Sequence, residues 1–167
     1  MVTIYLVVPV LVVIALVQAT VMPHVAVWGI FPDLPVLLVS SWGLLRGQGE
    51  GAVWGFIAGA ALDLLSGAPF GAATLALIAV GATAGLAKGS ALQAHVALPL
   101  LTVFLASILY DLVFLFVLRV AGDTVVWVDS FVRIILPSAV LNAVLIPPVL
   151  GLMRWLDNRY LREEMEW

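Results

Sequence analysis

The amino-acid sequence predicts an all-α integral membrane protein that forms a single helical domain over residues 1–167. Its composition is the first reason: 64% of the 167 residues are hydrophobic and 10% are charged. The second is the distribution of these residues, because apolar stretches recur along the whole chain, whereas a soluble protein confines them to one or two central helices. A mean hydropathy of +1.21 is far above that of a soluble domain of this size.

Polar, glycine and proline positions divide the chain into six apolar segments. The first is followed by further apolar segments and by no small-residue cleavage site, so we expect it to be a retained helix. The second and third are short for a bilayer that takes about 20 residues per helix. We expect six transmembrane helices, with four helices and a re-entrant hairpin as the alternative. The segments are 2–20, 33–45, 51–65, 70–87, 96–120 and 131–156.

The basic residues predict the orientation of these helices. Lysine and arginine concentrate on the cytoplasmic side of membrane proteins. An N-terminus inside the cell places Arg119 and Arg133 outside and the other basic residues inside. Both termini are then cytoplasmic, with a short cytoplasmic tail over about 157–167. The cytoplasmic basic residues are Arg46, Lys88, Arg154, Arg159 and Arg162.

Glycines recur at every fourth position in two neighbouring segments. Gly51, Gly55 and Gly59 form one such stripe, and Gly81, Gly85 and Gly89 form a second. Small residues at this spacing allow two membrane helices to approach closely. We expect the segments 51–65 and 70–87 to form an antiparallel hairpin through the turn SGAP. The stripes are equally suited to contact with a second copy, so a homodimer is the alternative.

Two aspartates lie within apolar segments, where a carboxylate is costly and is kept for pairing or function. Asp63 ends the third segment and Asp111 lies in the outer half of the fifth. Arg119 and Arg133 are the candidate partners. We therefore predict a polar cluster of these four residues near the outer face, with structural pairing favoured over catalysis.

Other polar and proline residues have expected structural roles. Asp33 follows Pro32 and is expected to cap the helix that it opens, and a ligand role would require it to face an outer cavity. Asn142 is expected to hydrogen-bond across helices. The sixth segment should kink or unwind at its prolines. These prolines are Pro137, Pro147 and Pro148.

The sequence argues against several classes of site. It has no cysteine, and its two histidines, His24 and His95, are expected on opposite sides of the membrane, so we expect neither a metal site nor a cofactor. The scattered basic residues do not form a nucleic-acid surface. Asp63 lacks the Gly-x-Gly-Asp context of intramembrane aspartyl proteases, and no Gly-x-Ser-x-Gly run suggests a serine protease. We expect no catalytic residues.

The stretch FPDLPVLLVSSWGLLRGQGEGAVWGFIAGAALDLLSGAPFGAATLAL closely resembles the rod shape-determining protein MreD family. Members of that family carry Pro-Asp-Leu at the start of the second helix, then Arg-Gly, and then an acidic residue followed by glycine. A glycine-rich helix follows and ends in Asp-Leu-Leu-Ser-Gly-x-Pro-Leu-Gly, where this chain has Phe70 for the last leucine. The resemblance is specific over residues 31–85. The matching residues are Pro32, Asp33, Leu34, Arg46, Gly47, Gly55, Gly59, Asp63, Leu64, Ser66, Gly67, Pro69 and Gly71.

The resemblance implies a multi-pass protein of the bacterial cytoplasmic membrane that serves rod shape and side-wall peptidoglycan synthesis. It implies a non-enzymatic scaffold that binds MreC and acts indirectly with MreB, a glycosyltransferase and a class B penicillin-binding protein. The fold is expected to be similar to that of the substrate-binding subunits of energy-coupling factor transporters. The hairpin would then shape a surface or shallow outer cavity that receives a transmembrane or juxtamembrane helix of MreC.

A small-molecule uptake subunit of the vitamin-binding type is the alternative function. Few polar groups are available to line a ligand site in this sequence. They are Asp33, Asp63, Asp111 and Asn142.

Overall fold

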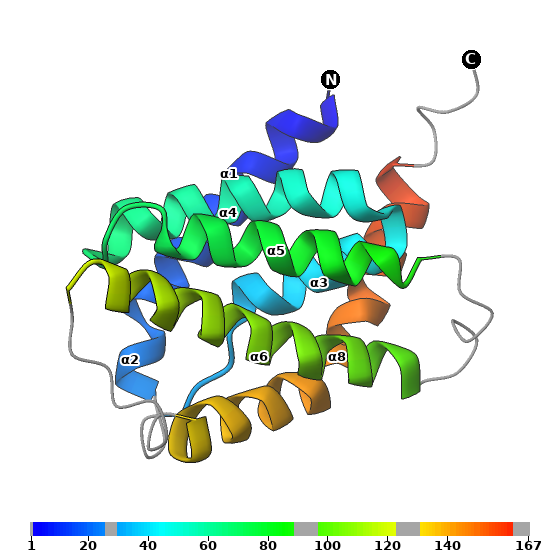
Figure 1. The fold of residues 1–167 in the computed structure, drawn as a ribbon. Coiled ribbons are helices and arrows are strands. Elements are labelled where there is room, and N and C mark those ends of the chain that lie inside the picture. Colours follow the sequence, from blue (N-terminus) through cyan, green and yellow to red (C-terminus); the bar gives the residue numbers. More distant parts are fainter. Residues whose placement is uncertain (1, 26–29, 89–96, 123–130, 162–167) are drawn as a thin grey trace.

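The computed structural model describes residues 2–25, 30–88, 97–122 and 131–161, most of which are helical (Figure 1). Gly89, His95 and the tail beyond residue 161, with Arg162, lie outside these ranges. Each predicted apolar segment contains a helix of 13 residues or more, which confirms the all-α prediction. The elements are α1 (Val2–Thr20), α2 (Met22–Val25), α3 (Leu34–Arg46), α4 (Gln48–Ser66), α5 (Ala72–Leu86), α6 (Ala97–Val120), the π-helical turn η2 (Phe131–Ile135), α8 (Leu136–Leu156) and the π-helical turn η3 (Asp157–Leu161).

Helix α4 is longer than the sequence predicted, because α3 and α4 are joined by a single residue. Gly47 adopts φ 103°, in the region that favours glycine, and lets the chain reverse directly after Arg46. Residues 48–50 are polar, so hydropathy alone does not assign them to a helix. They form the first turn of α4, which brings its length to 19 residues.

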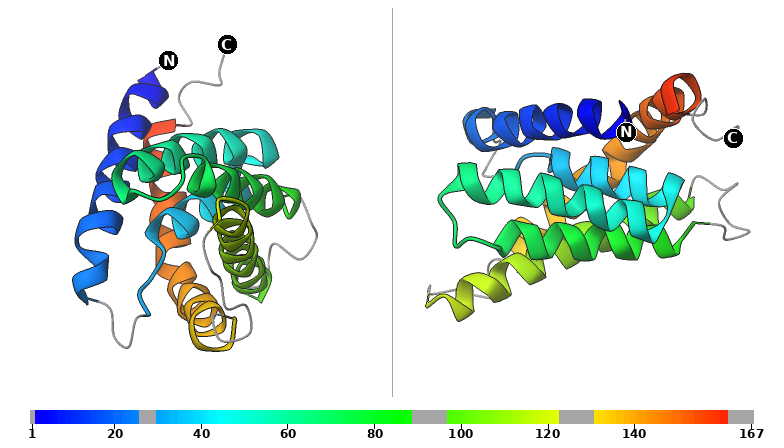
Figure 2. Two further views of the ribbon diagram at one scale, coloured as in Figure 1. Left: turned by 60° about the vertical axis from the view of Figure 1, so that its left-hand side comes forward. Right: turned by 90° about the horizontal axis from the view of Figure 1, so that it is seen from above.

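Helices α4 and α5 lie side by side and antiparallel, as Figures 1 and 2 both show. A β-carbon on Gly51, Gly55 or Gly59 would collide with the backbone of α5 at Gly81, Leu77 and Thr74 respectively. The predicted hairpin is therefore confirmed, and its two glycine stripes face each other. Because the stripes are buried within one chain, they no longer argue for a homodimer.

Helix α3 forms the centre of the bundle. Every residue from Pro35 to Leu44 is buried, and the helix contacts α4, α5, α6 and α8. Its position accounts for its mostly apolar composition, since a helix enclosed on all sides has no face turned to water, and its two serines, Ser40 and Ser41, are buried with the rest. It is also short, with 13 residues, because it begins after a proline-containing loop and ends at Gly47.

The surface of the surrounding helices is strongly apolar. Leu101, Leu105 and Phe116 on α6 are 57%, 55% and 61% exposed. Such a surface suits contact with lipid. Within the described residues, Ala97–Val120 and Val132–Arg159 are long and apolar enough to cross a bilayer, and α3 and α5 are shorter apolar helices.

Helix α8 is continuous but bent. Pro147 and Pro148 lie inside it, and Pro137 stands in its first turn. Figure 1 shows the yellow-orange half of the helix and its orange-red half running in different directions. Each proline removes one backbone hydrogen bond and crowds the preceding turn, which bends a helix. The predicted kink is confirmed, whereas the helix does not unwind.

Candidate functional site

Asp63 joins the two helices of the hairpin at their connecting turn. Its side chain is 5% exposed and faces the start of α5. Its Oδ2 atom accepts hydrogen bonds from Gly71 N at 2.9 Å, Thr74 N at 3.0 Å and Thr74 Oγ1 at 2.6 Å. Its Oδ1 atom accepts one from Ala73 N at 2.9 Å. The carboxylate therefore satisfies the N–H groups that the first turn of α5 leaves without partners.

The rest of the turn explains the motif Asp-Leu-Leu-Ser-Gly-x-Pro. Ser66 Oγ accepts a bond of 3.4 Å from Ala68 N. Gly67 and Gly71 adopt φ of 68° and 100°, a backbone conformation that other residues rarely take. Pro69 O accepts a bond from Ala72 N at 3.1 Å. The prediction that Asp63 and Ser66 satisfy N–H groups of the turn is confirmed.

Asp33 makes a different contact from the predicted one. Its side chain forms no capping bond to α3. Its Oδ1 atom instead accepts a hydrogen bond of 3.1 Å from Gln18 Nε2 of α1, and Gln18 Oε1 accepts one of 3.1 Å from Leu34 N. Gln18 is thus the residue that caps α3. The capping prediction for Asp33 was wrong because the loop turns its carboxylate toward α1, at φ −89° and ψ 87°.

Asn142 connects three elements. Its Oδ1 atom accepts a bond of 2.9 Å from Asp33 N, and its Nδ2 atom donates one of 3.0 Å to Ser107 Oγ. The side chain is fully buried. The prediction of a hydrogen bond across helices is confirmed, and it holds α8 against α6 and the start of α3.

A cavity of about 380 Å³ lies beside these polar contacts, at the end of the bundle where α4 ends and α5 begins. Asp33 and Asp111 both line it. The Oδ2 atom of Asp111 is buried and has no hydrogen-bond partner among the described residues. None of the described residues that line the cavity is basic. They are Gln18, Ala19, Pro23, Phe31, Asp33, Leu62, Leu65, Ser66, Ala73, Tyr110, Asp111, Phe114, Ile134 and Ser138.

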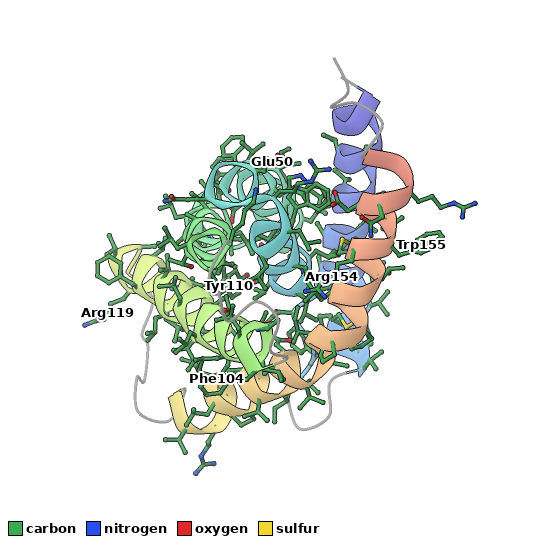
Figure 3. All side chains as sticks on the ribbon, turned by 90° about the vertical axis from the view of Figure 1, so that its right-hand side faces the viewer. Glu50, Phe104, Tyr110, Arg119, Arg154 and Trp155 are labelled. Carbon is green, nitrogen blue, oxygen red and sulfur yellow. The ribbon has the colours of Figure 1, made fainter. Side chains whose placement is uncertain are left out.

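The structure does not form the predicted cluster of Asp63, Asp111, Arg119 and Arg133. Arg119 and Arg133 are exposed, and Figure 3 shows Arg119 pointing away from the bundle and Tyr110 toward its interior. Arg119 follows Asp111 by eight residues and so lies about 80° around the helix from it. Long basic side chains also extend from apolar surfaces toward water. Asp63 is turned toward α5, and Asp111 faces the cavity.

Arg46 organises the opposite end of the bundle. Its Nη2 and Nε atoms contact Asp157 Oδ1 at 2.5 and 2.7 Å, which joins the end of α3 to η3. Its backbone oxygen accepts a bond of 2.7 Å from Lys88 Nζ. Its guanidinium also lies 5.4 Å from the ring centroid of Trp42, which stacks on Trp54. Arg46 thus secures the C-terminal segment to the α3–α4 turn.

We expect Arg46→Gln and Asp157→Asn to show coupled effects on stability. Both side chains are partly exposed, 16% and 21%, so their coupling energy should be only about 1 kcal/mol. A double-mutant cycle on thermal unfolding in detergent would measure it. Additive single effects would show that the contact does not stabilise the fold.

Comparison with family models identifies the chain: the model described as rod shape-determining protein MreD matches residues 1–156 of the 167. The chain belongs to the MreD family. It is therefore a membrane protein involved in determining rod shape, from a family that is not known for enzymatic activity. Searches of curated proteins and of solved structures found no significant match. The likeness of MreD to energy-coupling factor subunits thus stays a prediction.

Several residues that line the cavity or, like Ser107, bond Asn142 nearby were not predicted to be important in this MreD protein. Gln18 had the clearest signal, since it is the only amide in its apolar segment and an amide in hydrocarbon needs a partner. Tyr110, Ser107 and Ser138 gave little signal, because tyrosine and serine are ordinary residues of membrane helices. Whether these side chains face the site depends on how α6 and α8 pack against the other helices, and hydropathy does not predict helix packing.

Proposed function

We propose that this MreD protein is a non-enzymatic scaffold of the cell-elongation complex, and that it holds a transmembrane or juxtamembrane helix of MreC at the cavity. Family membership supports the role in rod shape. The cavity supports the binding role, because it is a concave site of about 380 Å³ with a rigid wall. The proposal places the protein in the bacterial cytoplasmic membrane, with the other elongation proteins reached through MreC.

The arrangement of helix ends supports six spans with both termini in the cytoplasm. Arg46, Lys88 and Asp157 meet at one end of the bundle. The cavity lies at the other end, beside the last turn of α4 and the first turn of α5. Since basic residues favour the cytoplasmic side, the Arg46 end faces inward and the cavity opens toward the outside.

The hairpin is suited to be the fixed wall of such a site. Leu62, Leu65, Ser66 and Ala73 of the hairpin line the cavity. Glycine contacts hold α4 against α5, and Asp63 holds the turn, so these four residues have little freedom to move apart. A preorganised surface loses less conformational freedom on binding. The motif residues therefore act as a structural support for the partner site.

Filling the cavity should prevent capture of MreC. We would purify the protein from its native membranes with a tag at the C-terminus and identify the proteins that accompany it. Leu65 lines the cavity and is 43% exposed, so Leu65→Trp should place an indole in the site without disturbing the core. We expect MreC with the unaltered protein and at least about tenfold less with the variant.

Leu86→Trp is the matched control, because Leu86 is 67% exposed at the far end of the hairpin. This variant should recover as much MreC as the unaltered protein. Equal recovery with Leu65→Trp would exclude the cavity as the docking site, and the absence of MreC from the unaltered sample would refute the scaffold proposal.

The cavity is also the observation that favours the alternative, a vitamin-type uptake subunit. Its carboxyl, amide and hydroxyl groups are the mixture that orients a small ligand within an apolar pocket. Recovery of an ATPase module or of a bound small molecule in the same purification would select this function. An aspartyl protease has no such support, because both carboxylate oxygens of Asp63 bind α5.

A further inference from the structure

We propose that the cavity receives one basic side chain, a lysine or arginine of the partner helix, between Asp33 and Asp111. This inference rests on the proposed function and specifies the chemistry by which the partner is recognised. It predicts that a cationic side chain, and not only shape, determines which helix the protein holds.

One carboxyl oxygen at the cavity lacks a hydrogen-bond donor in the part of the chain that the structure describes. Asp111 Oδ2 is buried without a partner among the described residues. Ser138, which is 6% exposed, and Asp33 line the cavity with it. A buried acceptor in a native protein is nearly always satisfied, so the unpartnered oxygen of Asp111 indicates a missing donor.

The charge of the cavity selects a cation. Asp33 and Asp111 both line the cavity, and no described lining residue carries a positive charge. An ammonium or guanidinium group would supply several donors and would favour the charged form of both carboxyl groups. The headgroup of a zwitterionic lipid would bring a phosphate into the same site, which the carboxylates oppose. A basic side chain brings no anion with it.

The walls suit the stem of such a side chain. Leu62, Leu65, Phe114 and Ile134 line the cavity together with the carboxylates. Lysine and arginine place their methylene groups along apolar surfaces and extend their charged heads toward polar partners. One long side chain therefore matches both the apolar walls and the acidic interior.

The charge preference can be measured without the partner. The sequence has no cysteine, so Ser138→Cys introduces a single thiol at the cavity wall. In nanodiscs we would compare its reaction with 2-aminoethyl and 2-sulfonatoethyl methanethiosulfonate, each relative to free cysteine. We expect the cationic reagent to be favoured by about tenfold or more. Asp111→Asn should abolish most of this preference.

Thr83→Cys is the control, in a groove on α5 and α6 whose described lining residues carry no charge. It should show no preference between the two reagents. The proposal is overturned if Ser138→Cys behaves like this control, if it reacts with neither reagent, or if Asp111→Asn leaves its preference unchanged.

The partner is tested by purifying the double variant Asp33→Asn, Asp111→Asn from native membranes. We expect at least about tenfold less MreC than with the unaltered protein. In the unaltered background, Ser138→Cys should form a disulfide with a cysteine that replaces one particular basic residue of MreC. Full recovery of MreC with the double variant refutes this inference and leaves the scaffold proposal standing.

The two proposals fail in different ways. If the unaltered protein captures no MreC, the scaffold proposal fails, and with it the assignment of the cation to a partner side chain. If an aminophospholipid accompanies the unaltered protein and is lost from the double variant, the cavity binds a headgroup, which overturns the assignment to a side chain.

Discussion

Gly59→Leu is expected to prevent α4 and α5 from forming their hairpin. A β-carbon at this position would meet the backbone of α5, with Ala73 O only 2.8 Å away. Backbone atoms cannot move aside as the end of a flexible side chain can, so the helices must separate along the stripe. Overpacking of this kind costs about 3 kcal/mol or more. We expect loss of the monodisperse protein in size-exclusion chromatography, or a large fall in its unfolding temperature.

Gly151→Leu is the matched control for this variant. Gly151 lies within α8, is exposed, and has no atom within 4 Å of the position a β-carbon would take. The change adds the same side chain to a helix, so the two variants differ only in what the new atoms meet. If both variants unfold at the same temperature, contact along the stripe does not hold the hairpin together.

The glycine stripes show what the sequence could predict. A spacing of four residues places Gly51, Gly55 and Gly59 on one helix face, and a short turn forces the following helix to lie alongside. Both features involve residues that are near one another in the sequence, so the hairpin could be predicted from it. Whether the stripes contact each other or a second copy depends on the three-dimensional arrangement, which only the structure shows.

The polar contacts of Asp33 show what the sequence could not predict. Its neighbours in sequence indicated an ordinary helix cap, whereas its partners come from α1 and α8, with Asn142 lying 109 residues away. Likewise, Arg119 was expected near Asp111 because opposite charges attract. The rotation between the two positions and the exposure of Arg119 prevented the contact. Hydropathy defines helices well but does not determine which of their faces meet.

The distribution of polar residues suggests a division of labour in this MreD protein. Both carboxylate oxygens of Asp63 accept hydrogen bonds from the start of α5, so this side chain stabilises the fold. Asp111, at the cavity, keeps one buried oxygen without a partner among the residues that the structure describes. Two aspartates that hydropathy treats alike thus have different roles, one in holding the hairpin and one in a site that the hairpin borders.

Asp63→Leu is therefore expected to destabilise the protein strongly and to loosen the hairpin wall of the cavity. The substitution keeps a side chain of similar length but removes the acceptor for three backbone N–H groups and the Thr74 hydroxyl. Each buried donor left unsatisfied costs about 1 to 3 kcal/mol, so the total should exceed about 3 kcal/mol. Hydrogen exchange at Ala73 and Thr74 should accelerate far more than exchange in α6.

Asp63→Asn separates the hydrogen bonds from the charge. An asparagine oxygen in the Oδ2 position can still accept from Gly71 and Thr74, but its NH₂ group then faces the N–H of Ala73. We expect a loss of about 1 to 3 kcal/mol, smaller than for leucine, and a thermal transition between those of the unaltered protein and Asp63→Leu. Asparagine as damaging as leucine would show that the negative charge at the start of α5 contributes more than the individual bonds. Asparagine without effect would show that the bonds to Gly71 and Thr74 suffice to hold the turn.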